Sequence, residues 1–368
     1  MKTILMLSLV AFALCADAGR VYFGTGNGNG IYFADFDEET GELTQPQLAI
    51  ELGRPGFLAI HPNKQYLYST AFGGTLGRQG GVAAMKIAPE GRLELLNMQA
   101  TEGKGNCHVS LDQTGQLLTT AYYGSGSVAS FGILADGSVS EAKSYFAHSG
   151  SGTHPKRQNK AYAHSVVMNP ANTHAYAADL GIDKIMIYRI EPKAGTLTPA
   201  GEAIVPGGGM GPRHMKWNRE GSILYVLNEL DLSVSVFKAV AQGKLEFVET
   251  VPTLPEGADK TQMTCAEIRI HPNGKFIYAS NRDLSQQRRD SITLFSRFED
   301  GFKRIESTPA QVWVPRNFNL APSGKWMLVA GQRSNDIAIF QVNPETGKLT
   351  FSGTTVPLAG APICIEFL

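Results

Sequence analysis

The 368-residue sequence predicts an all-β chain folded as a seven-bladed β-propeller. A turn of the form Gly-x-Leu, or a close relative, recurs along the chain, and a second marker, a turn pair seven positions before an often aromatic strand residue, recurs with it. The turns follow one another about every 50 residues, a period that suits four short strands per repeat. The turn glycines are Gly41, Gly91, Gly137, Gly195, Gly243, Gly301 and Gly347.

The strand marker supports the same number of repeats. A turn pair such as His61-Pro62 or His271-Pro272 stands seven positions before an aromatic residue, here Tyr68 and Tyr278. Apolar and β-branched residues dominate the segments on both sides of each turn, as packed strands require. Each internal repeat therefore predicts an inner strand, a turn and a second strand.

The remaining repeat is divided between the two chain ends. Residues 361–367 read as a lone inner strand, whereas residues 20–23 begin a repeat at its second strand. Pairing the two segments would close the ring and remove free sheet edges. The glycine-rich segment 24–30 lies between strands with no helix after it, so we expect a flexible loop and not a nucleotide site.

The N-terminus reads as a cleavable export signal. Residues 1–18 combine an early lysine, a short apolar run and a small-x-small end, which predicts a mature propeller domain over residues 19–368. The apolar run is too short to span a bilayer. We therefore expect a secreted or periplasmic protein with no membrane span. A lipid anchor on Cys15 is the less favoured alternative, because Leu14 precedes it where a small residue is wanted.

The composition argues against several classes of partner and cofactor. The formal net charge is +0, which argues against nucleic acid or an anionic membrane as a partner of the whole chain. Cys107, Cys265 and Cys364 lack metal-ligand spacing, so buried free thiols are expected. We expect a monomer that needs no metal and no other cofactor.

Two repeat positions place side chains at one mouth of the ring. The start of an inner strand and the end of the antiparallel second strand lie at the same end of a blade. The first position holds Gly56, Cys107, His164, Arg213, Ala266, Arg316 and Ile363, and the second holds Phe72, Tyr123, Leu180, Glu229, Arg282, Gln332 and Gly26. Ionisable residues gather on one sector of this mouth, which makes it the candidate site.

The segments around these residues resemble the propeller-type lactonase family, whose members include 6-phosphogluconolactonases and carboxymuconate cyclases. The matching segments are residues 163–167, 211–214, 227–230 and 279–282, and the resemblance extends over essentially the whole mature chain. It implies an active-site set of His164, Arg213, Glu229 and Arg282. An insertion at residues 286–290 departs from the family pattern and is expected to shape the rim of the mouth.

Opening a lactone needs an activated water and hydrogen-bonding or positive groups where the oxyanion develops. We expect His164 to act as general acid/base, with Glu229 as its partner or as an alternative base. Guanidinium groups bind oxyanions in bidentate fashion, which predicts an anionic lactone as the ligand. The expected substrate-binding residues are Arg213, Arg282, Arg316 and Gln332.

Three functions remain open from the sequence. The first is metal-free hydrolysis of a sugar lactone such as 6-phosphogluconolactone, and the second is the cyclase reaction that closes a carboxymuconate to its lactone. The third is a non-catalytic exported propeller that binds a partner. His164 and Glu229 favour an enzyme over a binding module but do not separate the first two.

Other ionisable residues have structural interpretations. His61 and His271 occupy turn positions. His108 and His214 directly follow mouth positions, so alternation along a strand predicts that they point to the opposite face. Glu267 has the same relation to its neighbour and is only a reserve candidate.

Overall fold

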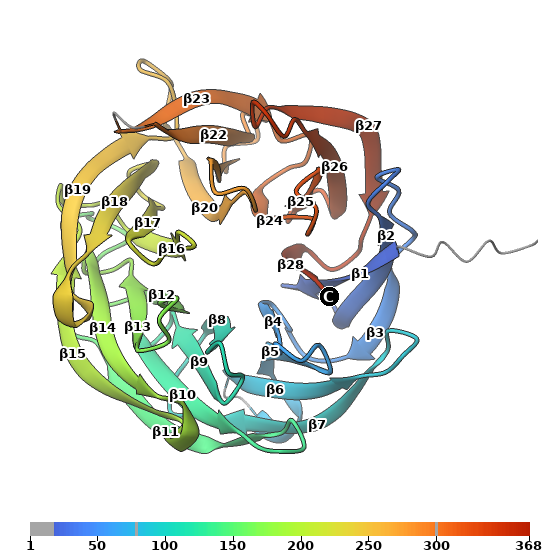
Figure 1. The fold of residues 1–368 in the computed structure, drawn as a ribbon, viewed down its shortest axis with the longest axis vertical. Coiled ribbons are helices and arrows are strands. Elements are labelled where there is room, and N and C mark those ends of the chain that lie inside the picture. The colour runs from blue at the N-terminus through green and yellow to red at the C-terminus, as the bar shows by residue number, and fades with distance from the viewer. Residues whose placement is uncertain (1–17, 78–79, 299–300) are drawn as a thin grey trace, which may run out of the picture.

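The computed structural model describes residues 18–77, 80–298 and 301–368, which form seven four-stranded antiparallel sheets. The sheets stand as blades around a central axis, so the predicted seven-bladed fold is confirmed (Figure 1). The residues of the expected export signal before Ala18 lie outside the described ranges.

Within each blade the strands are ordered from the central axis outward. The blade that holds both chain ends is built from β28 (Pro362–Phe367), β1 (Ala18–Thr25), β2 (Gly30–Asp37) and β3 (Gln47–Glu51). The next two are β4 (Leu58–Ile60), β5 (Tyr66–Phe72), β6 (Gly80–Ile87) and β7 (Leu93–Ala100), then β8 (Asn106–Leu111), β9 (Leu117–Tyr122), β10 (Ser127–Ile133) and β11 (Val139–Ala147).

The other four blades repeat this order. They are β12 (Ala163–Met168), β13 (His174–Asp179), β14 (Lys184–Glu191) and β15 (Thr196–Ile204); β16 (Pro212–Trp217), β17 (Ile223–Asn228), β18 (Ser233–Ala239) and β19 (Leu245–Pro252); β20 (Met263–Ile270), β21 (Phe276–Asp283), β22 (Ser291–Phe298) and β23 (Gly301–Pro309); and β24 (Pro315–Leu320), β25 (Trp326–Gly331), β26 (Asp336–Val342) and β27 (Leu349–Pro357). Single-turn 3₁₀ helices connect some strands: η1 (Gly74–Leu76), η2 (Pro192–Ala194) and η3 (Ala241–Gly243).

The chain ends meet in one sheet. The last strand, β28, pairs antiparallel with β1, from Val21 opposite Phe367 to Thr25 opposite Pro362. Figure 1 shows the red end of the chain beside its blue beginning. This pairing covers the edge that β1 would otherwise present toward the axis.

A hydrogen bond between neighbouring blades joins the two repeat markers. The tyrosine hydroxyl of one blade donates to the carbonyl of the turn glycine in the next, over 2.7–3.0 Å. The pairs are Tyr22 with Gly91, Tyr68 with Gly137, Tyr176 with Gly243 and Tyr278 with Gly347. A side chain at Gly137, where φ is 86°, would also collide with the Tyr66 ring. The two sequence markers of the repeat are thus in contact across the boundary between neighbouring blades.

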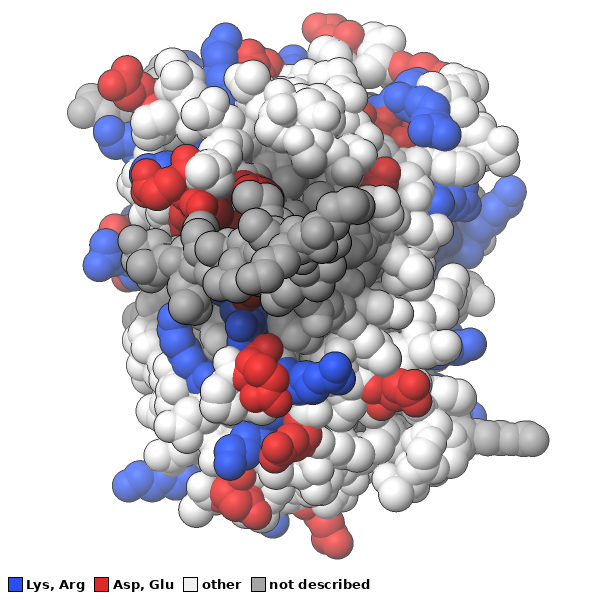
Figure 2. Space-filling model, turned by 90° about the vertical axis from the view of Figure 1, so that its right-hand side faces the viewer, with Lys and Arg blue, Asp and Glu red and all other residues white. Residues whose placement is uncertain are grey.

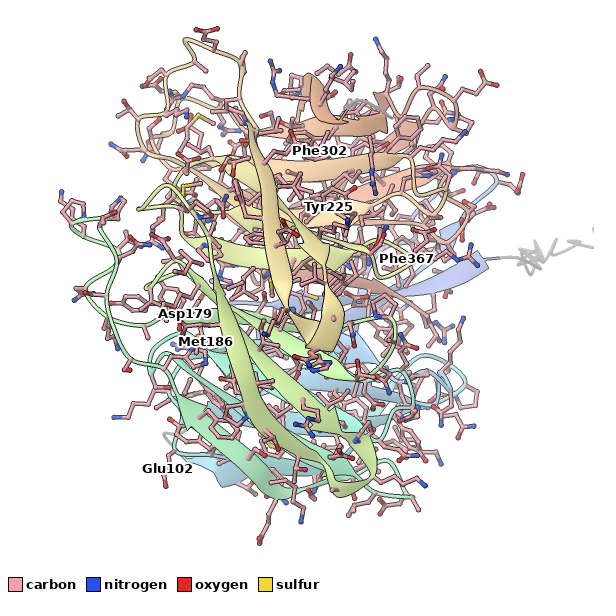
Figure 3. All side chains as sticks on the ribbon, turned by 60° about the vertical axis from the view of Figure 1, so that its left-hand side comes forward. Glu102, Asp179, Met186, Tyr225, Phe302 and Phe367 are labelled. Atoms are coloured by element: carbon pink, nitrogen blue, oxygen red, sulfur yellow. The ribbon has the colours of Figure 1, made fainter. Side chains whose placement is uncertain are left out.

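The hydrophobic core lies between adjacent sheets. Tyr225 of β17, for example, packs on Phe302 of β23 in the next blade, with ring centroids 5.2 Å apart (Figure 3). Similar contacts around the ring bury the apolar face of each sheet against its neighbour. The blades therefore stabilise one another as a continuous ring.

The inner strands carry β-bulges at the mouth. In five blades of the described chain, the pairing between the inner strand and the second strand skips one residue of the inner strand. In a sixth blade, residues 266 and 267 of the inner strand together face a single residue of the second strand. The skipped residues are Cys107, His164, Arg213, Arg316 and Ile363. A bulge bends its strand and redirects the side chains beside it, so strict alternation fails at these positions.

The outer surface carries charges of both signs. Lysine and arginine side chains are interspersed with aspartate and glutamate on the face seen in Figure 2, in keeping with the balanced composition. Over the described part of the chain, no helix is long and apolar enough to cross a membrane.

Candidate active site at the mouth of the ring

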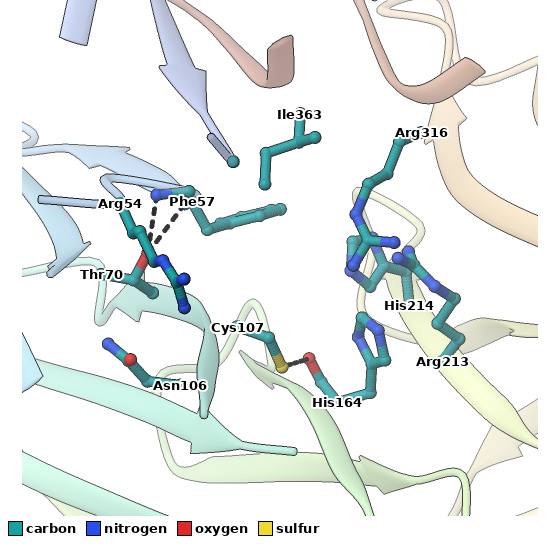
Figure 4. A pocket seen from close by; sticks show the side chains of 12 residues that line it. Arg54, Phe57, Thr70, Asn106, Cys107, His164, Arg213, His214, Arg316 and Ile363 are labelled. Atoms are coloured by element: carbon teal, nitrogen blue, oxygen red, sulfur yellow. Dashed lines mark hydrogen bonds between the residues drawn. The ribbon is translucent and has the colours of Figure 1, made fainter. Parts of the chain in front are cut away.

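A cavity of about 180 Å³ opens where the bulged inner strands begin. Its lining includes Arg54, Cys107, His164, Arg213, His214 and Arg316. Figure 4 shows the two histidines, Arg213 and Arg316 gathered on one side, opposite Arg54 and Thr70. The first repeat position thus supplies the expected histidine and two of the expected arginines.

Glu229 and Arg282 lie behind this lining, at the ends of the second strands. Glu229 follows β17 and is 4% exposed, and Arg282 on β21 is equally buried. Gln332 directly follows β25 and is partly exposed; its backbone N–H donates to the carbonyl of Val314 over 3.0 Å. The side chain of Gln332 lies outside the cavity lining.

Glu229 is the centre of an arginine cluster. Its Oε2 accepts from Nε of Arg213 over 2.8 Å and lies 3.2 Å from a terminal nitrogen of Arg282, while its Oε1 accepts from Arg157 over 2.7 Å. Burial alone would raise the pKa of this carboxyl, but the positive charges of Arg282, Arg213 and Arg157 outweigh burial and lower it to about 2. Glu229 is therefore ionised at neutral pH and serves as the common counter-ion of this cluster.

Sequence reasoning did not include Arg157. It lies in the segment between β11 and β12, where its guanidinium also donates to the hydroxyl of Tyr123 over 3.1 Å. Burial acts to lower the pKa of Arg157, but Glu229 and the hydrogen bond to Tyr123 hold it above its usual value. The repeat frame covers only strands and their turns, so a residue of this long connection had no position in it.

His164 reaches the cavity from the bulge on β12. Its ring meets those of Tyr123 and His214 edge to face, with centroids 5.6 and 5.3 Å away. Burial, reinforced by the positive charge of Arg213, holds the pKa of His164 well below its usual range, so the imidazole is neutral. Its Nδ1 is buried without a hydrogen-bond partner among the described residues.

The expectation for His214 was wrong. It lines the same cavity as Arg213, although the two are consecutive in the sequence. The register of β16 skips Arg213, pairing Pro212 with Asn228 and His214 with Leu227. This bulge breaks the alternation that placed the His214 ring on the opposite face of the strand from Arg213. His108 follows the bulge on β8 in the same way, and its ring centroid lies 5.4 Å from that of His214.

Glu267 contacts one cavity histidine, His214, from β20, the inner strand of the neighbouring blade. This fully buried carboxylate on β20 lies 3.1 Å from Nδ1 of His214 and accepts from Nδ2 of Asn317 over 2.5 Å. Its other oxygen accepts from the backbone N–H of Ile268 over 2.9 Å. Burial acts to raise the pKa of Glu267, but His214 and Arg269 hold it well below its usual range.

Arg316 gives the cavity a positive charge that the protein leaves unbalanced. No carboxylate among the described residues lies within ion-pair distance of its guanidinium. Burial and the neighbouring charges of Arg213 and Arg282 lower the pKa of Arg316 to about 9, so it still carries its proton at neutral pH. Such a cation is stabilised when an anion enters the cavity.

Cys107 lines the cavity with a thiol that is protonated at neutral pH. Its Sγ lies 3.3 Å from the carbonyl oxygen of His164, and burial raises its pKa to about 11. Cys107 is free and partly exposed, whereas Cys265 and Cys364 are free and buried, so the expectation of buried thiols is confirmed for two of the three. Across the described ranges, no cluster of three or more His, Cys, Asp or Glu residues is placed to hold a metal ion.

The insertion after Arg282 is tied to a neighbouring segment. Nε of Arg289 contacts Asp283 over 3.0 Å, and a terminal nitrogen of Arg289 contacts Asp259 over 2.6 Å. Arg288 lies over the ring of Trp313 at 5.1 Å. These contacts hold the insertion outside the cavity lining.

Histidines assigned to turns make contacts between blades. Nε2 of His61 lies 3.1 Å from the carbonyl oxygen of Gly115, and Nε2 of His271 lies 3.0 Å from that of Gly324. Both contacts join neighbouring blades away from the cavity, which makes these residues suitable controls.

Comparisons with known proteins agree with this architecture. Residues 20–367 match the family model described as "Lactonase, 7-bladed beta-propeller". The chain is 33% identical over 355 residues to a 6-phosphogluconolactonase of Bacillus subtilis, covering 94% of this chain and 97% of the relative. It is 34% identical over 328 residues to a 6-phosphogluconolactonase of Formosa agariphila, covering 88% and 91%.

A solved structure shows the same fold. The periplasmic gluconolactonase of Pseudomonas aeruginosa superimposes with a TM-score of 0.87 at 26% identity, covering 96% of this chain and 99% of that one. The family match extends over nearly the whole sequence, and the seven sheets agree with the number of blades that the family description gives. The chain belongs to the seven-bladed β-propeller lactonase family.

Proposed function

We propose that this protein hydrolyses an anionic sugar lactone of the 6-phosphogluconolactone type in the mouth cavity. The observation that carries the proposal is Arg316, a cation that lines the cavity with no carboxylate partner among the described residues. Arg54 and Arg213 line the same space, whereas Glu229 faces the arginines behind it. A phosphate or carboxylate on the substrate would balance this charge.

The relatives support this substrate class. Two of them are named 6-phosphogluconolactonase, and a third is named as a gluconolactonase. All of these names describe the opening of a sugar lactone. They favour hydrolysis over the cyclase reaction and over a purely binding role.

The residues divide the chemistry between them. His164 supplies a neutral imidazole for general acid/base catalysis, and Arg213 and Arg316 bind the anion and stabilise the developing oxyanion. Glu229 holds Arg213 in place, and Arg282 contacts the same carboxylate. We assign Glu229 to this supporting role, because a carboxylate with a pKa of about 2 is a weak base. Gln332 remains a candidate contact for a larger substrate at the rim.

We also infer that the protein is exported with cleavage after Ala18. The sequence pattern at the N-terminus and the periplasmic relative support this inference. Cleavage there would remove the signal and leave β1 intact from Gly19 onward. Mass spectrometry of protein recovered from the cell exterior or periplasm should show a chain that begins at Gly19. An intact Met1 or a lipid on Cys15 would contradict the inference.

The test compares a charged with an uncharged substrate. Opening of 6-phosphogluconolactone and of unphosphorylated gluconolactone is followed for the full-length protein, for Arg316→Gln and for Arg333→Gln, with spontaneous hydrolysis subtracted. A lost charge-assisted contact corresponds to about 10- to 100-fold in kcat/KM. Arg316→Gln should lose this factor on the phosphorylated lactone and much less on the neutral one. Arg333, which stacks on Trp313 outside the cavity, is the control.

Two results would contradict the proposal. A folded wild-type protein that accelerates neither lactone would exclude sugar-lactone hydrolysis and favour a binding propeller. Equal losses on both lactones in Arg316→Gln would show that Arg316 does not recognise the anionic group.

A further inference from the structure

We propose that His214 is a second catalytic imidazole of this site, acting as the general base that takes a proton from water, and that Glu267 is the residue that positions it. The inference rests on the proposed lactone hydrolysis and specifies which group activates water. It assigns the role of base to a pair that lies outside the set implied by the family resemblance.

The two ring nitrogens of His214 have different environments. Nδ1 lies 3.1 Å from Oε2 of Glu267, and Nε2 is buried with no protein partner in the described part of the chain. A carboxylate acts as acceptor for an Nδ1–H group, so this contact fixes the proton on Nδ1 and leaves a lone pair on Nε2. Because the ring lines a polar cavity, a water or a substrate oxygen is the available partner for that lone pair.

Glu267 is itself held rigidly. Asn317 from β24 and the backbone N–H of Ile268 donate to its two oxygens, and Arg269 lies 3.7 Å away. Its side chain is completely buried, where an ionised carboxylate is stable only with such partners. The anion therefore has a fixed position from which it stabilises the positive charge that His214 acquires when it accepts a proton.

His164 lacks an equivalent support. Its ring contacts those of Tyr123 and His214, and its Nδ1 has no hydrogen-bond partner among the described residues. Glu229, the other carboxylate near the cavity, is shared by Arg157, Arg213 and Arg282. His214 is thus the cavity imidazole with a carboxylate in contact, which makes it the better base. In this assignment the role of base moves from His164 to His214, and His164 donates a hydrogen bond to a substrate oxygen.

His214 accepts one proton during the reaction and returns it before the reaction ends. Its Nε2 takes a proton from water as the water oxygen bonds to the lactone carbonyl carbon, and the carbonyl electrons move to the oxygen that the arginines face. When the tetrahedral intermediate collapses, the bond between this carbon and the ring oxygen breaks. The leaving oxygen takes the proton back from Nε2, which yields the hydroxy acid and neutral His214.

The surroundings of His214 determine its titration. The titratable and charged groups that face it are Glu267 from β20, Arg213 and Lys216 from β16, His108 from β8 and His164 from β12. Burial lowers the pKa of His214 to about 4, although Glu267 acts to raise it. The imidazole is therefore free to accept a proton at neutral pH. Turnover should fall as the pH drops through about 4 and His214 becomes protonated.

The experiment measures kcat against pH for the full-length wild type and for His214→Gln, Glu267→Gln, Glu267→Asp and His271→Gln, using the lactone that the wild type opens fastest. In His214→Gln, turnover should fall by about 10²- to 10⁴-fold, the effect of losing a general base. The fall of kcat at low pH, which is the acid limb of the profile, should also disappear. Glu267→Gln should lower turnover and move the acid limb to lower pH. Glu267→Asp keeps the negative charge, so it should restore part of the turnover and part of the wild-type position of the acid limb. His271→Gln is the matched control, because Nε2 of His271 contacts the carbonyl oxygen of Gly324 away from the cavity.

A second measurement does not depend on turnover. Nitrogen-15 NMR of histidine-labelled protein should show His214 with its proton on Nδ1 in the wild type and with altered protonation in Glu267→Gln. A proton on Nε2 in the wild type would overturn the inference. Wild-type turnover and an unchanged acid limb in folded His214→Gln would also overturn it, while leaving lactone hydrolysis standing. Absence of turnover in the wild type would instead contradict the proposed function.

Discussion

Glu229 shows how a single buried charge organises the site. Arg157, Arg213 and Arg282 come from a connecting segment and from two different blades, and all of them contact its carboxylate. Without this anion, the arginines would repel one another in a place with little water. Removing one partner of a buried ion cluster leaves uncompensated charge, which is strongly destabilising.

Replacing Glu229 tests this role through stability. Glu229→Gln should lower the free energy of unfolding at pH 7 by about 3–5 kcal/mol. Because the folded-state pKa of Glu229 is lowered from 4.5 to about 2, its stabilisation is complete above pH 4.5 and is lost as the pH falls toward 2. The difference from wild type should therefore narrow between pH 7 and pH 3 in urea unfolding. A constant difference would contradict the assignment, and Glu345→Gln, on an exposed turn, is the control.

The sequence predicted some of these side chains and missed others for identifiable reasons. His164, Arg213 and Arg316 share one repeat position, so their convergence on the cavity follows from blade symmetry. Arg157 belongs to a connection outside the repeat. His214 was placed on the wrong face because the alternation rule assumes an unbroken strand, and the bulge at Arg213 depends on a register with β17 that one strand does not reveal.

At the scale of the strands, the blades are linked by the tyrosine-to-glycine hydrogen bond. The hydroxyl of Tyr68 on β5 donates to the carbonyl of Gly137 over 2.9 Å, and both groups are buried. The sequence markers that predicted the fold are the two ends of this contact. The number of blades could be predicted because these two markers recur along the sequence. Their spacing in the sequence does not show that the tyrosine and the glycine touch.

Removing one such hydroxyl should weaken the ring measurably. Tyr68→Phe leaves the Gly137 carbonyl without its donor in a buried place, which costs about 1–3 kcal/mol in the free energy of unfolding. Chemical denaturation measures this loss. Tyr66→Phe on the same strand is the control, because its ring is only partly buried and the change should be small. Equal stability of Tyr68→Phe and wild type would show that the interblade bond contributes nothing.

At the scale of the whole molecule, the ring depends on the last strand. Cys364 and Ile365 of β28 are fully buried, and the strand pairs with β1 over its length. These residues supply the inner strand of the blade that joins the chain ends, and they complete the packing on both sides of it. The segment is therefore part of the core, although it lies at the end of the sequence.

Deleting residues 361–368 should destabilise the protein far more than trimming a loose terminus. The deletion exposes the edge of β1 and opens the ring, so a lower melting temperature and aggregation are expected. Deleting Leu368 alone removes one backbone hydrogen bond to Arg20 and is the control. A truncated protein that melts with the full-length one would contradict closure by β28.

The most direct test of the mouth cavity as a lactone-opening site is the turnover number of His164→Ala beside wild type and His61→Ala. Loss of the His164 imidazole, as an acid/base group or as a hydrogen-bond donor to a substrate oxygen, should lower turnover of His164→Ala by about 10²- to 10³-fold, with an unchanged melting temperature. His61 contacts the carbonyl of Gly115 away from the cavity, so His61→Ala should keep its activity. Full activity in well-folded His164→Ala would contradict catalysis by this residue at the mouth of the ring.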